Sequence, residues 1–283
     1  MREQAPAKVN LDLRVTGRRP DGYHELDSVV AFTAWADELT FAPARGLGLE
    51  LAGPFAPALA EPCENLVLRA ARRLAERAGC PARARITLDK RIPVAAGLGG
   101  GSADAAATLR GLNRLWRLGL ELSDLLPLAR ELGADVPVCL ALRPARMRGI
   151  GELIEPIALP ALDLVLVNPN RPVSTAQVFQ SLDRVGSDSG SADPVPSERA
   201  ALLAWLAARG NDLEAPARRL VPEIDEVLAA LRAQPGCRLA RMSGSGATCF
   251  GIFENGPGAA RAADALRRAR PSWWAISTAT RPS

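Results

Sequence analysis

Residues 97–101 hold four glycines in five positions, and this run constrains the chain more than any other stretch. Directly after it comes an alanine-rich segment with helical spacing, from Ala105 to Trp116. A loop without side chains that leads into a helix exposes backbone N–H groups beside the positive end of the helix dipole, which suits a phosphate. The alternative is a turn that needs glycine only for positive φ angles, although such a turn ordinarily uses one or two glycines. The run therefore predicts a phosphate-binding loop at the start of a helix.

The loop differs from the two most familiar phosphate-binding loops. A Walker A loop ends in Gly-Lys-Ser/Thr, whereas here Gly101 is followed directly by Ser102. A dinucleotide-binding fingerprint that began at Gly97 would need glycine or alanine in place of Ser102, near the start of a βαβ fold. The run instead lies a third of the way along the chain. It is a phosphate loop of another kind.

Composition argues against several other classes of protein. The chain has 283 residues, 48% of them hydrophobic, and its net charge of +4 is spread along the sequence without a basic stripe, so nucleic-acid binding gains little support. No apolar run approaches the roughly 18 residues that span a membrane, and the first residues contain no apolar signal core. Five widely spaced cysteines without a Cys-x-x-Cys pair indicate buried thiols in a reducing compartment, not disulfides or a zinc site. We expect a cytoplasmic protein.

The order of the predicted helices and strands indicates an α+β fold, not a doubly wound sheet. Apolar and polar residues alternate from Lys8 to Val15, as in a half-buried strand with Lys8 and Asn10 on its polar face. Residues 17–22 predict a turn and residues 186–198 a polar loop. Further strands are predicted near 28–41, 47–52, 84–90, 162–167, 237–242, 248–253 and 273–279.

Helices are predicted near 65–78, after the glycine loop up to 118, at 123–133 with Ser123 as its cap, and near 198–209, 222–233 and 257–270. Asp135 takes an N-cap-like position ahead of Val136 and Pro137. A proline-bounded segment at 156–160 divides the chain into predicted domains of residues 1–158 and 159–283.

Some residue types are so scarce that their positions attract attention. Only two of the 35 basic residues are lysines, Lys8 and Lys90, and the only histidine, His24, adjoins the only tyrosine, Tyr23. Lysine provides a compact ammonium with three donors, where arginine provides a planar fork. Codon bias alone could explain why so few lysines are present. For Lys8, the alternative to a functional role is an ordinary surface position on an edge strand.

Phosphoryl transfer needs a cradle for the donor phosphates, positive charge on the transferred group, and a residue that orients or deprotonates the acceptor hydroxyl. The glycine loop would supply the cradle. Ser102 could bind a phosphate oxygen or Mg²⁺, or it could simply cap the helix. Asp104 suits the helix dipole without any metal. Asp135 is the candidate base, although an N-cap aspartate would have the same local sequence.

The ordered set of motifs resembles the GHMP small-molecule kinases. Their phosphate loop has the form Pro-x-x-x-Gly-Leu-Gly-Ser-Ser-Ala, and this chain carries a longer, glycine-rich form of it at 93–103, with Ala95 and Ala96 where that form usually has glycine. Residues 6–11 (Pro-Ala-Lys-Val-Asn-Leu) and 133–137 (Gly-Ala-Asp-Val-Pro) are similar to the segments with the family's paired lysine and catalytic aspartate.

This resemblance implies that Lys8 holds Asp135 ionised and helps to polarise the acceptor hydroxyl or the γ-phosphate. It also implies a two-domain fold, with an N-terminal ribosomal-protein-like βαβ domain and a C-terminal ferredoxin-like α/β sandwich. ATP and Mg²⁺ are the implied cofactors, and no metal ligand is assigned apart from Ser102 as a candidate. The implied ATP-binding residues are Asn65, Lys90, Pro93, Gly97, Leu98, Gly99, Gly100, Gly101 and Ser102.

Residues 18–26 (Arg-Arg-Pro-Asp-Gly-Tyr-His-Glu-Leu) are similar to the signature of one branch of the family, whose acceptor is a cytidine diphosphate sugar alcohol. The resemblance implies that Tyr23 and His24 hold the cytosine by ring stacking and hydrogen bonds to its edge. It implies that Thr175 lines the acceptor site and that Phe179 stacks on the cytosine from the other side, with helix core packing as the alternative for Phe179. Asn10 is assigned to the same acceptor site.

The implied activity is ATP-dependent phosphorylation of the 2-hydroxyl of 4-diphosphocytidyl-2-C-methyl-D-erythritol in non-mevalonate isoprenoid synthesis. The alternatives are a GHMP kinase for another small alcohol, of the homoserine or mevalonate type, and a non-catalytic nucleotide-binding protein on the same fold. The expected partners are small molecules, and the chain is expected to be a monomer or a weak homodimer. Segments 148–152, 211–214 and 242–248 also match the family in spacing; the last is similar to a glycine turn near its active site.

Overall fold

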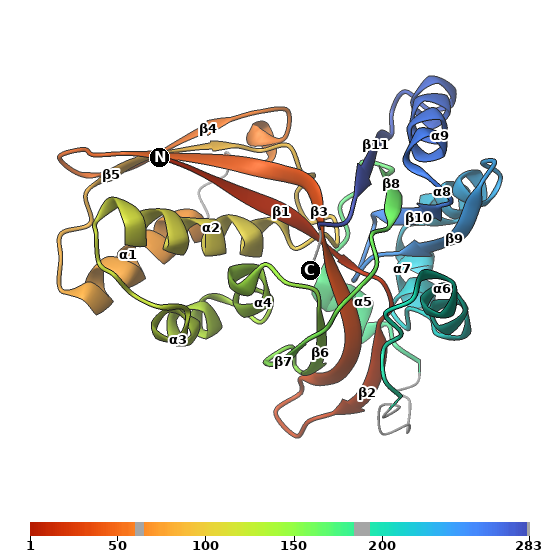
Figure 1. Cartoon of the computed structure of the whole chain (residues 1–283), viewed down its shortest axis with the longest axis horizontal. Coiled ribbons are helices and arrows are strands. Elements are labelled where there is room, and N and C mark those ends of the chain that lie inside the picture. The colour runs from red at the N-terminus through yellow and green to blue at the C-terminus, as the bar shows by residue number, and fades with distance from the viewer. Residues whose placement is uncertain (60–64, 184–192, 282–283) are drawn as a thin grey trace. The chain divides into compact units, whose positions relative to one another are not determined.

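The computed structural model describes residues 1–59, 65–183 and 193–281 (Figure 1). The chain forms two compact units, and neither is continuous in sequence. Unit 1 comprises Met1–Lys8, Trp35–Val94 and Gly99–Leu142, and unit 2 comprises Val9–Ala34, Ala95–Leu98 and Arg143–Ser283. Strands β1 (Arg2–Asn10) and β3 (His24–Ala42) contribute residues to both units. A single domain boundary near residue 158 stays a prediction.

Unit 1 combines a mixed sheet with a group of packed helices. The C-terminal part of β3 runs antiparallel to β5 (Ala84–Asp89), and β4 (Leu47–Ala52) lies parallel to β5 at the edge. Helix α2 (Gly100–Leu115) packs against the helices on both sides of it in sequence. The other helical elements of the unit are the 3-10 turn η1 (Ala56–Leu59), α1 (Leu66–Ala78), α3 (Leu122–Leu132) and α4 (Val136–Ala141).

The helices of unit 1 begin and end for local reasons. Asn65 caps α1 by accepting the N–H of Val67, and Gly79, with a φ of 62°, closes its C-terminus. The face of α2 predicted from its spacing is buried at Ala105, Leu109 and Leu112. The prediction for Ser123 was wrong, because α3 starts one residue earlier with a reciprocal capping box between Glu121 and Asp124. Asp135 does take the N-cap position of α4, but its side chain makes no capping hydrogen bond.

The N-terminal strand departs from its prediction in two ways. The alternating run does not form one strand, because β1 ends at Asn10 and β2 (Arg14–Arg18) begins four residues later. The predicted polar face is not solvated either, since Lys8, Asn10 and Asp12 are only 4%, 5% and 0% exposed. Each of these side chains has a polar partner that offsets its burial, and a period of two in the sequence does not reveal such partners.

Unit 2 contains two antiparallel sheet regions. In the first, the N-terminal part of β3 lies between β2 and β6 (Ala145–Gly149), and β6 forms a hairpin with β7 (Leu153–Pro156). The second has the strand order β11-β8-β10-β9. Its strands are β8 (Asp163–Asn168), β9 (Cys237–Met242), β10 (Cys249–Phe253) and β11 (Trp274–Ala279).

The second sheet confirms the ferredoxin-like prediction. Helix α8 (Glu223–Arg232) packs on β9 and β10, and α9 (Gly256–Ala269) packs on β8 and β11 (Figure 1). The order β8, α8, β9, β10, α9, β11 is a βαββαβ arrangement, and the fold is α+β as predicted. The sequence missed the β6–β7 hairpin and the short helices α5 (Thr175–Gln180) and α7 (Glu214–Leu220), whereas α6 (Arg199–Ala208) matches its prediction.

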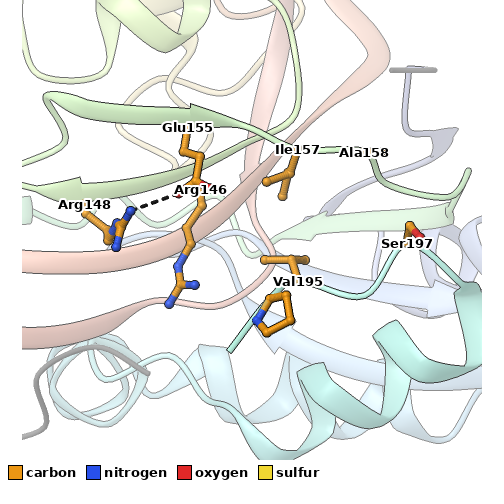
Figure 2. Close-up of a pocket in the computed structure, with 8 residues that line it drawn as sticks. Arg146, Arg148, Glu155, Ile157, Ala158, Val195 and Ser197 are labelled. Carbon is orange, nitrogen blue, oxygen red and sulfur yellow. Dashed lines mark hydrogen bonds and ion pairs between the residues drawn. The ribbon is translucent and has the colours of Figure 1, made fainter. Parts of the chain in front are cut away.

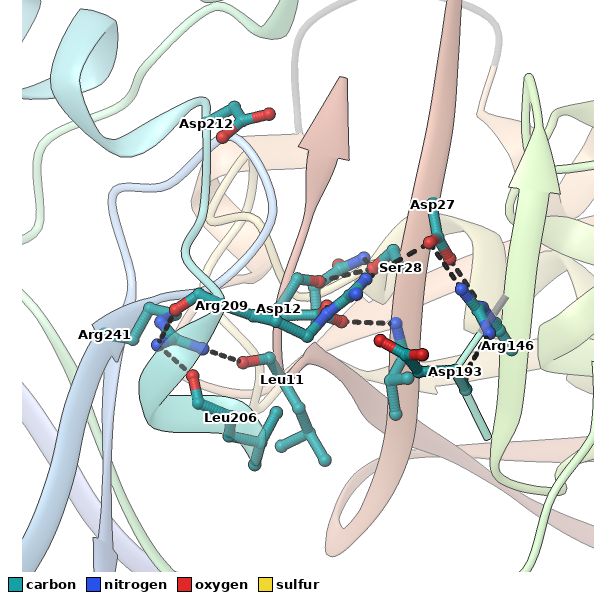
Figure 3. Close-up of polar contacts among 12 residues, drawn as sticks. Leu11, Asp12, Asp27, Ser28, Arg146, Asp193, Leu206, Arg209, Asp212 and Arg241 are labelled. Carbon is teal, nitrogen blue, oxygen red and sulfur yellow. Dashed lines mark hydrogen bonds and ion pairs between the residues drawn. The ribbon is translucent and has the colours of Figure 1, made fainter. Parts of the chain in front are cut away.

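A buried ionic network fastens the first sheet of unit 2 (Figure 3). Asp12 accepts the backbone N–H of Val29 and pairs with Arg209. Asp27 accepts two hydrogen bonds from Arg146, at 2.8 and 2.7 Å, and a third from Arg209 at 3.2 Å. Burial raises the pKa of Asp12, and Arg209 opposes that rise. The network explains how the break between β1 and β2 tolerates a carboxylate without solvent.

The remaining predictions on the fold have mixed outcomes. Cys139 and Cys249 are buried, as expected, but Cys80 and Cys237 are only half-buried; Cys63 lies outside the described residues. Most of the predicted loop at 186–198 also lies outside them, and residues 193–197 form no helix or strand. No helix within 1–59, 65–183 or 193–281 is long and apolar enough to cross a membrane.

A close contact between α2 and β3 gives a test of this fold. A Cβ placed on Gly111 would lie 2.4 Å from an edge carbon of the Phe41 ring. We expect Gly111→Ala to lower the free energy of unfolding by about 1–3 kcal/mol, because the core must shift to admit the methyl group. Thermal and urea unfolding monitored by circular dichroism would measure the change.

Gly101→Ala is the matched control, since it lies in the same helix and its Cβ would meet nothing within 4 Å. Helix propensity alone predicts that it is neutral or stabilising by up to about 1 kcal/mol. Equal unfolding midpoints for the two variants would contradict the packing described here.

Candidate active site

The predicted catalytic pair is formed within unit 1. The ammonium of Lys8 lies 3.0 Å from Oδ2 of Asp135, and their side chains are 5% and 36% exposed. Strand β1 supplies the lysine and the start of α4 supplies the aspartate. The carboxylate therefore reaches solvent while its partner cation is buried, an arrangement that suits a group acting on a bound hydroxyl.

The glycine loop packs directly over this pair at Gly99. Its φ is 62°, and a Cβ there would lie 3.0 Å from Cε and 3.3 Å from Cβ of Lys8. Gly99 is also the N-cap residue of α2, without a side chain to cap it. Glycine is thus required both by the left-handed backbone and by the close approach to the lysine stem.

Lys90 takes a place that the sequence did not predict. Its side chain is 2% exposed, and its ammonium lies 2.5 Å from Oδ2 of Asp37 and 2.6 Å from Oδ2 of Asp104. A Cβ on Gly100 would lie 3.0 Å from this ammonium. Lys90 thus lies beneath the first turn of α2. Its ammonium is paired with two carboxyl groups of the protein itself, whereas the sequence predicted that it contacts ATP.

The two carboxylates around Lys90 have different surroundings. Oδ1 of Asp37 accepts the backbone N–H groups of Arg91 and Ile92, at 2.5 and 2.8 Å. Oδ1 of Asp104 is buried and has no hydrogen-bond partner in the described part of the chain. Burial raises the pKa of Asp104 to about 7, and the charge on Lys90 only partly opposes this.

The other part of the loop belongs to unit 2 and is held by Ser243. The Ser243 hydroxyl accepts the backbone N–H of Asn10 at 3.1 Å and donates to the carbonyl of Gly97 at 2.9 Å. Gly97 has a φ of 73°, and a Cβ on it would lie 2.3 Å from the Ser243 carbonyl oxygen. Ala95 adopts a φ of 52°, so it takes a left-handed conformation without being glycine.

The predicted acceptor residues of unit 2 come together in part. The rings of His24 and Phe179 stack on each other, with centroids 5.0 Å apart and planes at 24°. No base fits between them at that separation, so the expected sandwich is not present in this arrangement. Tyr23 is 61% exposed. Burial, helped by the charge of Arg18, lowers the pKa of His24 below its usual 6.5, which favours the neutral imidazole.

Sequence reasoning assigned no role to Ser245 or Asn211, two further residues of unit 2. The hydroxyl of Thr175 lies 2.8 Å from that of Ser245, and the amide of Asn211 donates to the carbonyls of Met242 and Gly244 at 2.8 Å each. Asn10 donates from its side chain to Ser28 at 2.7 Å. The glycine-rich segment 242–248 was the available signal, although it did not assign a role to any one residue.

The remaining predicted nucleotide residues lie along the loop and at one helix start. Asn65 uses its side-chain oxygen to cap α1. Pro93 and Leu98 are buried, Gly101 is exposed, and Ser102 is half-buried in the first turn of α2. No group of three histidine, cysteine or carboxylate side chains within the described ranges could hold a metal ion.

A cavity of about 420 Å³ in unit 2 lies apart from all the predicted residues (Figure 2). Arg146 and Arg148 line it, but Arg146 pairs with Asp27 and Arg148 donates to Glu155 at 2.9 Å. Because its cations already have carboxylate partners, the cavity has no clear ligand.

The geometry described above, a glycine loop over an ion pair between a buried lysine and a partly exposed aspartate, suits a small-molecule kinase, and comparison with known proteins agrees. Models of the GHMP kinases N terminal domain and of the GHMP kinases C terminal match residues 65–141 and 196–271. The 4-diphosphocytidyl-2-C-methyl-D-erythritol kinase of Rhodospirillum rubrum is 54% identical over 274 residues, which cover 96% of this chain and 90% of the relative.

Solved structures agree with this result. A crystal structure of 4-(cytidine 5'-diphospho)-2C-methyl-D-erythritol kinase is 42% identical with a TM-score of 0.79, and the match covers 99% of this chain and 100% of that one. A homoserine kinase from Cytophaga hutchinsonii has a TM-score of 0.68 at 20% identity, covering 100% and 94%, and shares the fold alone. The chain belongs to the 4-diphosphocytidyl-2-C-methyl-D-erythritol kinase family of the GHMP kinases.

Asp104 makes stability depend on pH. Its pKa of about 7 in the folded protein lies above the ordinary value of 3.8, so between these values the folded state binds more protons than the unfolded state. Stability from this group is therefore lost as the pH rises. We expect the melting temperature of the wild type to fall relative to that of Asp104→Asn between about pH 5 and about pH 8.

Differential scanning calorimetry over this range would test the expectation. Asp264→Asn, which changes a carboxylate that is 50% exposed, is the control and should follow the wild type. Parallel curves for the wild type and Asp104→Asn would contradict the raised pKa.

Proposed function

We propose that this protein transfers the γ-phosphoryl group of ATP to the 2-hydroxyl of 4-diphosphocytidyl-2-C-methyl-D-erythritol, giving the 2-phosphate and ADP. The observation that carries the proposal is the ion pair between Lys8 and Asp135 in a chain of this family. Binding of a nucleotide alone would not need that pair. The product would serve non-mevalonate isoprenoid synthesis.

Asp135 would accept the proton of the acceptor hydroxyl as the oxygen attacks the γ-phosphorus. The pairing with Lys8 supports this role, because it orients a carboxylate that is 36% exposed. The Lys8 ammonium would also stabilise the negative charge that develops on the transferred group. It is one of only two lysines in the chain, and Gly99 packs against its stem.

The start of α2 would bind the phosphates of ATP. Gly100 and Gly101 have no side chains that would cover their backbone N–H groups. These groups lie at the positive end of a helix of 16 residues. Ser102 would donate its hydroxyl to a phosphate oxygen. Lys90 would act through the loop that it supports, since its ammonium already has two carboxylate partners. Asn65 and Pro93 are assigned to the nucleotide by family resemblance.

The described residues fit a Mg²⁺ ion that is held mainly by ATP. They contain no three-ligand cluster, and Mg²⁺ commonly binds through substrate phosphates and one or two protein oxygens. Ser102 is the candidate protein ligand. When bound, the ion neutralises charge on the phosphates.

The acceptor's cytosine would be recognised by Tyr23, His24 and Phe179. The neutral imidazole of His24 offers one donor and one acceptor, which suits the edge of cytosine. A base that stacks on the face of Phe179 now covered by His24 would displace the imidazole. Thr175 and Asn10 would contact the rest of the acceptor.

Removal of either member of the catalytic pair should reduce turnover. We expect Asp135→Asn and Lys8→Ala to lower kcat by about 10²–10⁴-fold, because each removes a group that acts in the transition state. Nucleotide affinity, measured by calorimetry with a non-hydrolysable ATP analogue, should change little. Asp225→Asn, an exposed carboxylate on α8, is the control. Full activity in either variant would refute the assigned roles.

The acceptor can be identified by ADP release from ATP. We expect kcat/KM to be at least about a hundredfold higher with the cytidylyl substrate than with mevalonate or homoserine, because only the first provides a base for the aromatic side chains. Tyr23→Ala should raise the KM for the cytidylyl substrate by about tenfold without affecting the KM for ATP. Equal rates with all three acceptors, or none with any, would overturn the proposal.

A further inference from the structure

The turn between β2 and β3 carries Tyr23, leads into His24 as the first residue of β3, and is held by its own backbone. The N–H of Arg19 donates to the carbonyl of Tyr23 at 2.7 Å, and the N–H of Gly22 donates to the carbonyl of Arg19 at 2.9 Å. The ring of Tyr23 is 61% exposed, so core packing does not fix its position. Something outside the turn must restrain it if the tyrosine is to be pre-organised for a ligand.

The side chain of Arg19 provides such a restraint. Its Nε donates to Oε1 of Glu25 at 3.1 Å, and its Nη2 donates to Oε1 of Glu152 at 2.9 Å. Glu25 lies on β3, directly after His24, while Glu152 lies in the turn between β6 and β7. One guanidinium therefore ties the aromatic turn to two neighbouring pieces of the sheet.

The carboxylate of Glu152 is held in place by the backbone at Gly149 and Ile150. Its Oε2 accepts the backbone N–H of Ile150 at 2.5 Å. A Cβ on Gly149 would lie 2.5 Å from the same oxygen, and the φ of Gly149 is 69°. Gly149 is paired with Leu26 in the ladder between β6 and β3, so the carboxylate is delivered beside the N-terminal end of β3. This explains the segment 148–152, which had matched the family without a role.

Electrostatics keeps the contact ionic at neutral pH. The hydrogen bonds that Arg19 donates to Glu152 and Glu25 raise the pKa of Arg19. Burial alone would raise the pKa of Glu152, but the hydrogen bonds from Arg19 and from the backbone hold it below its ordinary value. The side chains of Arg19 and Glu152 are about one-third exposed, at 31% and 33%, so solvent screens each pair and the effect of losing one is moderate.

We propose that Arg19 and Glu152 are positioning residues, which hold the turn of Tyr23 and His24 in the conformation that binds the cytosine of the acceptor. The inference rests on the proposed function, because it takes the cytidylyl group as the ligand of that turn. It assigns the Gly-Ile-Gly-Glu segment at 149–152 to acceptor specificity. Neither residue is a catalytic residue.

Glu152→Gln tests the inference. We expect the KM for the cytidylyl acceptor to rise about fivefold, while kcat and the KM for ATP stay within about twofold of the wild type. A general structural defect would raise both KM values or lower kcat. The matched control is Glu155→Gln in the same hairpin, whose carboxylate accepts a hydrogen bond from Arg148 at 2.9 Å and is 59% exposed. It should leave all three constants unchanged.

A second variant separates geometry from charge. Arg19→Lys keeps the positive charge but loses the planar fork that reaches two carboxylates, so it should raise the acceptor KM as Glu152→Gln does. The double variant should be no worse than the more affected single variant, since both remove one shared contact. Affinity for cytidine diphosphate, measured by calorimetry, should fall in parallel, and melting temperatures would verify that each variant is folded.

The outcomes distinguish the inference from the proposed function. If the wild type phosphorylates the cytidylyl acceptor and Glu152→Gln behaves like Glu155→Gln, the positioning role is wrong and the function stands. The positioning role also fails if the KM for ATP rises as much as that for the acceptor. A wild type that does not phosphorylate the cytidylyl acceptor refutes the proposed function itself.

Discussion

A lysine ammonium buried between two carboxyl groups supports the start of α2, and the glycine loop that precedes this helix depends on it. Lys90 places a single positive charge between the side chains of Asp37 and Asp104. Asp37 in turn fixes the backbone that follows β5. Such a cluster is costly to bury, and removal of its cation would leave two buried carboxyl groups without their ionic partner. The glycine loop, which has few side chains of its own, is therefore supported by the ionic contacts of Lys90 with Asp37 and Asp104.

The second lysine is used in a different way. Lys8 is as deeply buried as Lys90, but its partner Asp135 remains partly open to solvent. One lysine thus supports the glycine loop from within the protein, while the other pairs with a carboxylate that solvent can reach.

Sequence patterns predicted most of the architecture, and family resemblance predicted the pairing of Lys8 with Asp135. Long periodic segments such as α2, β3 and α9 fell within a few residues of their positions, since their burial follows from local spacing. The burial of Lys8, Asn10 and Asp12 was not predictable in this way, because it depends on partners far along the chain. The same reason hid the buried state of Lys90. The self-stacked rings of His24 and Phe179 were equally out of reach, as residues from β3 and α5 meet only in three dimensions.

The interleaving of the two units along the chain has a consequence for biosynthesis. Residues Val9–Ala34 are synthesised before unit 1 is complete, yet they belong to unit 2, most of which begins only at Arg143. Unit 1 can be completed once Leu142 has been synthesised. At that point the early strands of unit 2 still lack β6, with which β3 pairs, and Arg209, which pairs with Asp12. During that interval β2 and the N-terminal part of β3 can pair with each other, but the edge of β3 that later pairs with β6 has no native partner, which exposes it to aggregation and to chaperones. The order in which the segments are synthesised, and not only the final contacts, therefore constrains the folding pathway of this chain.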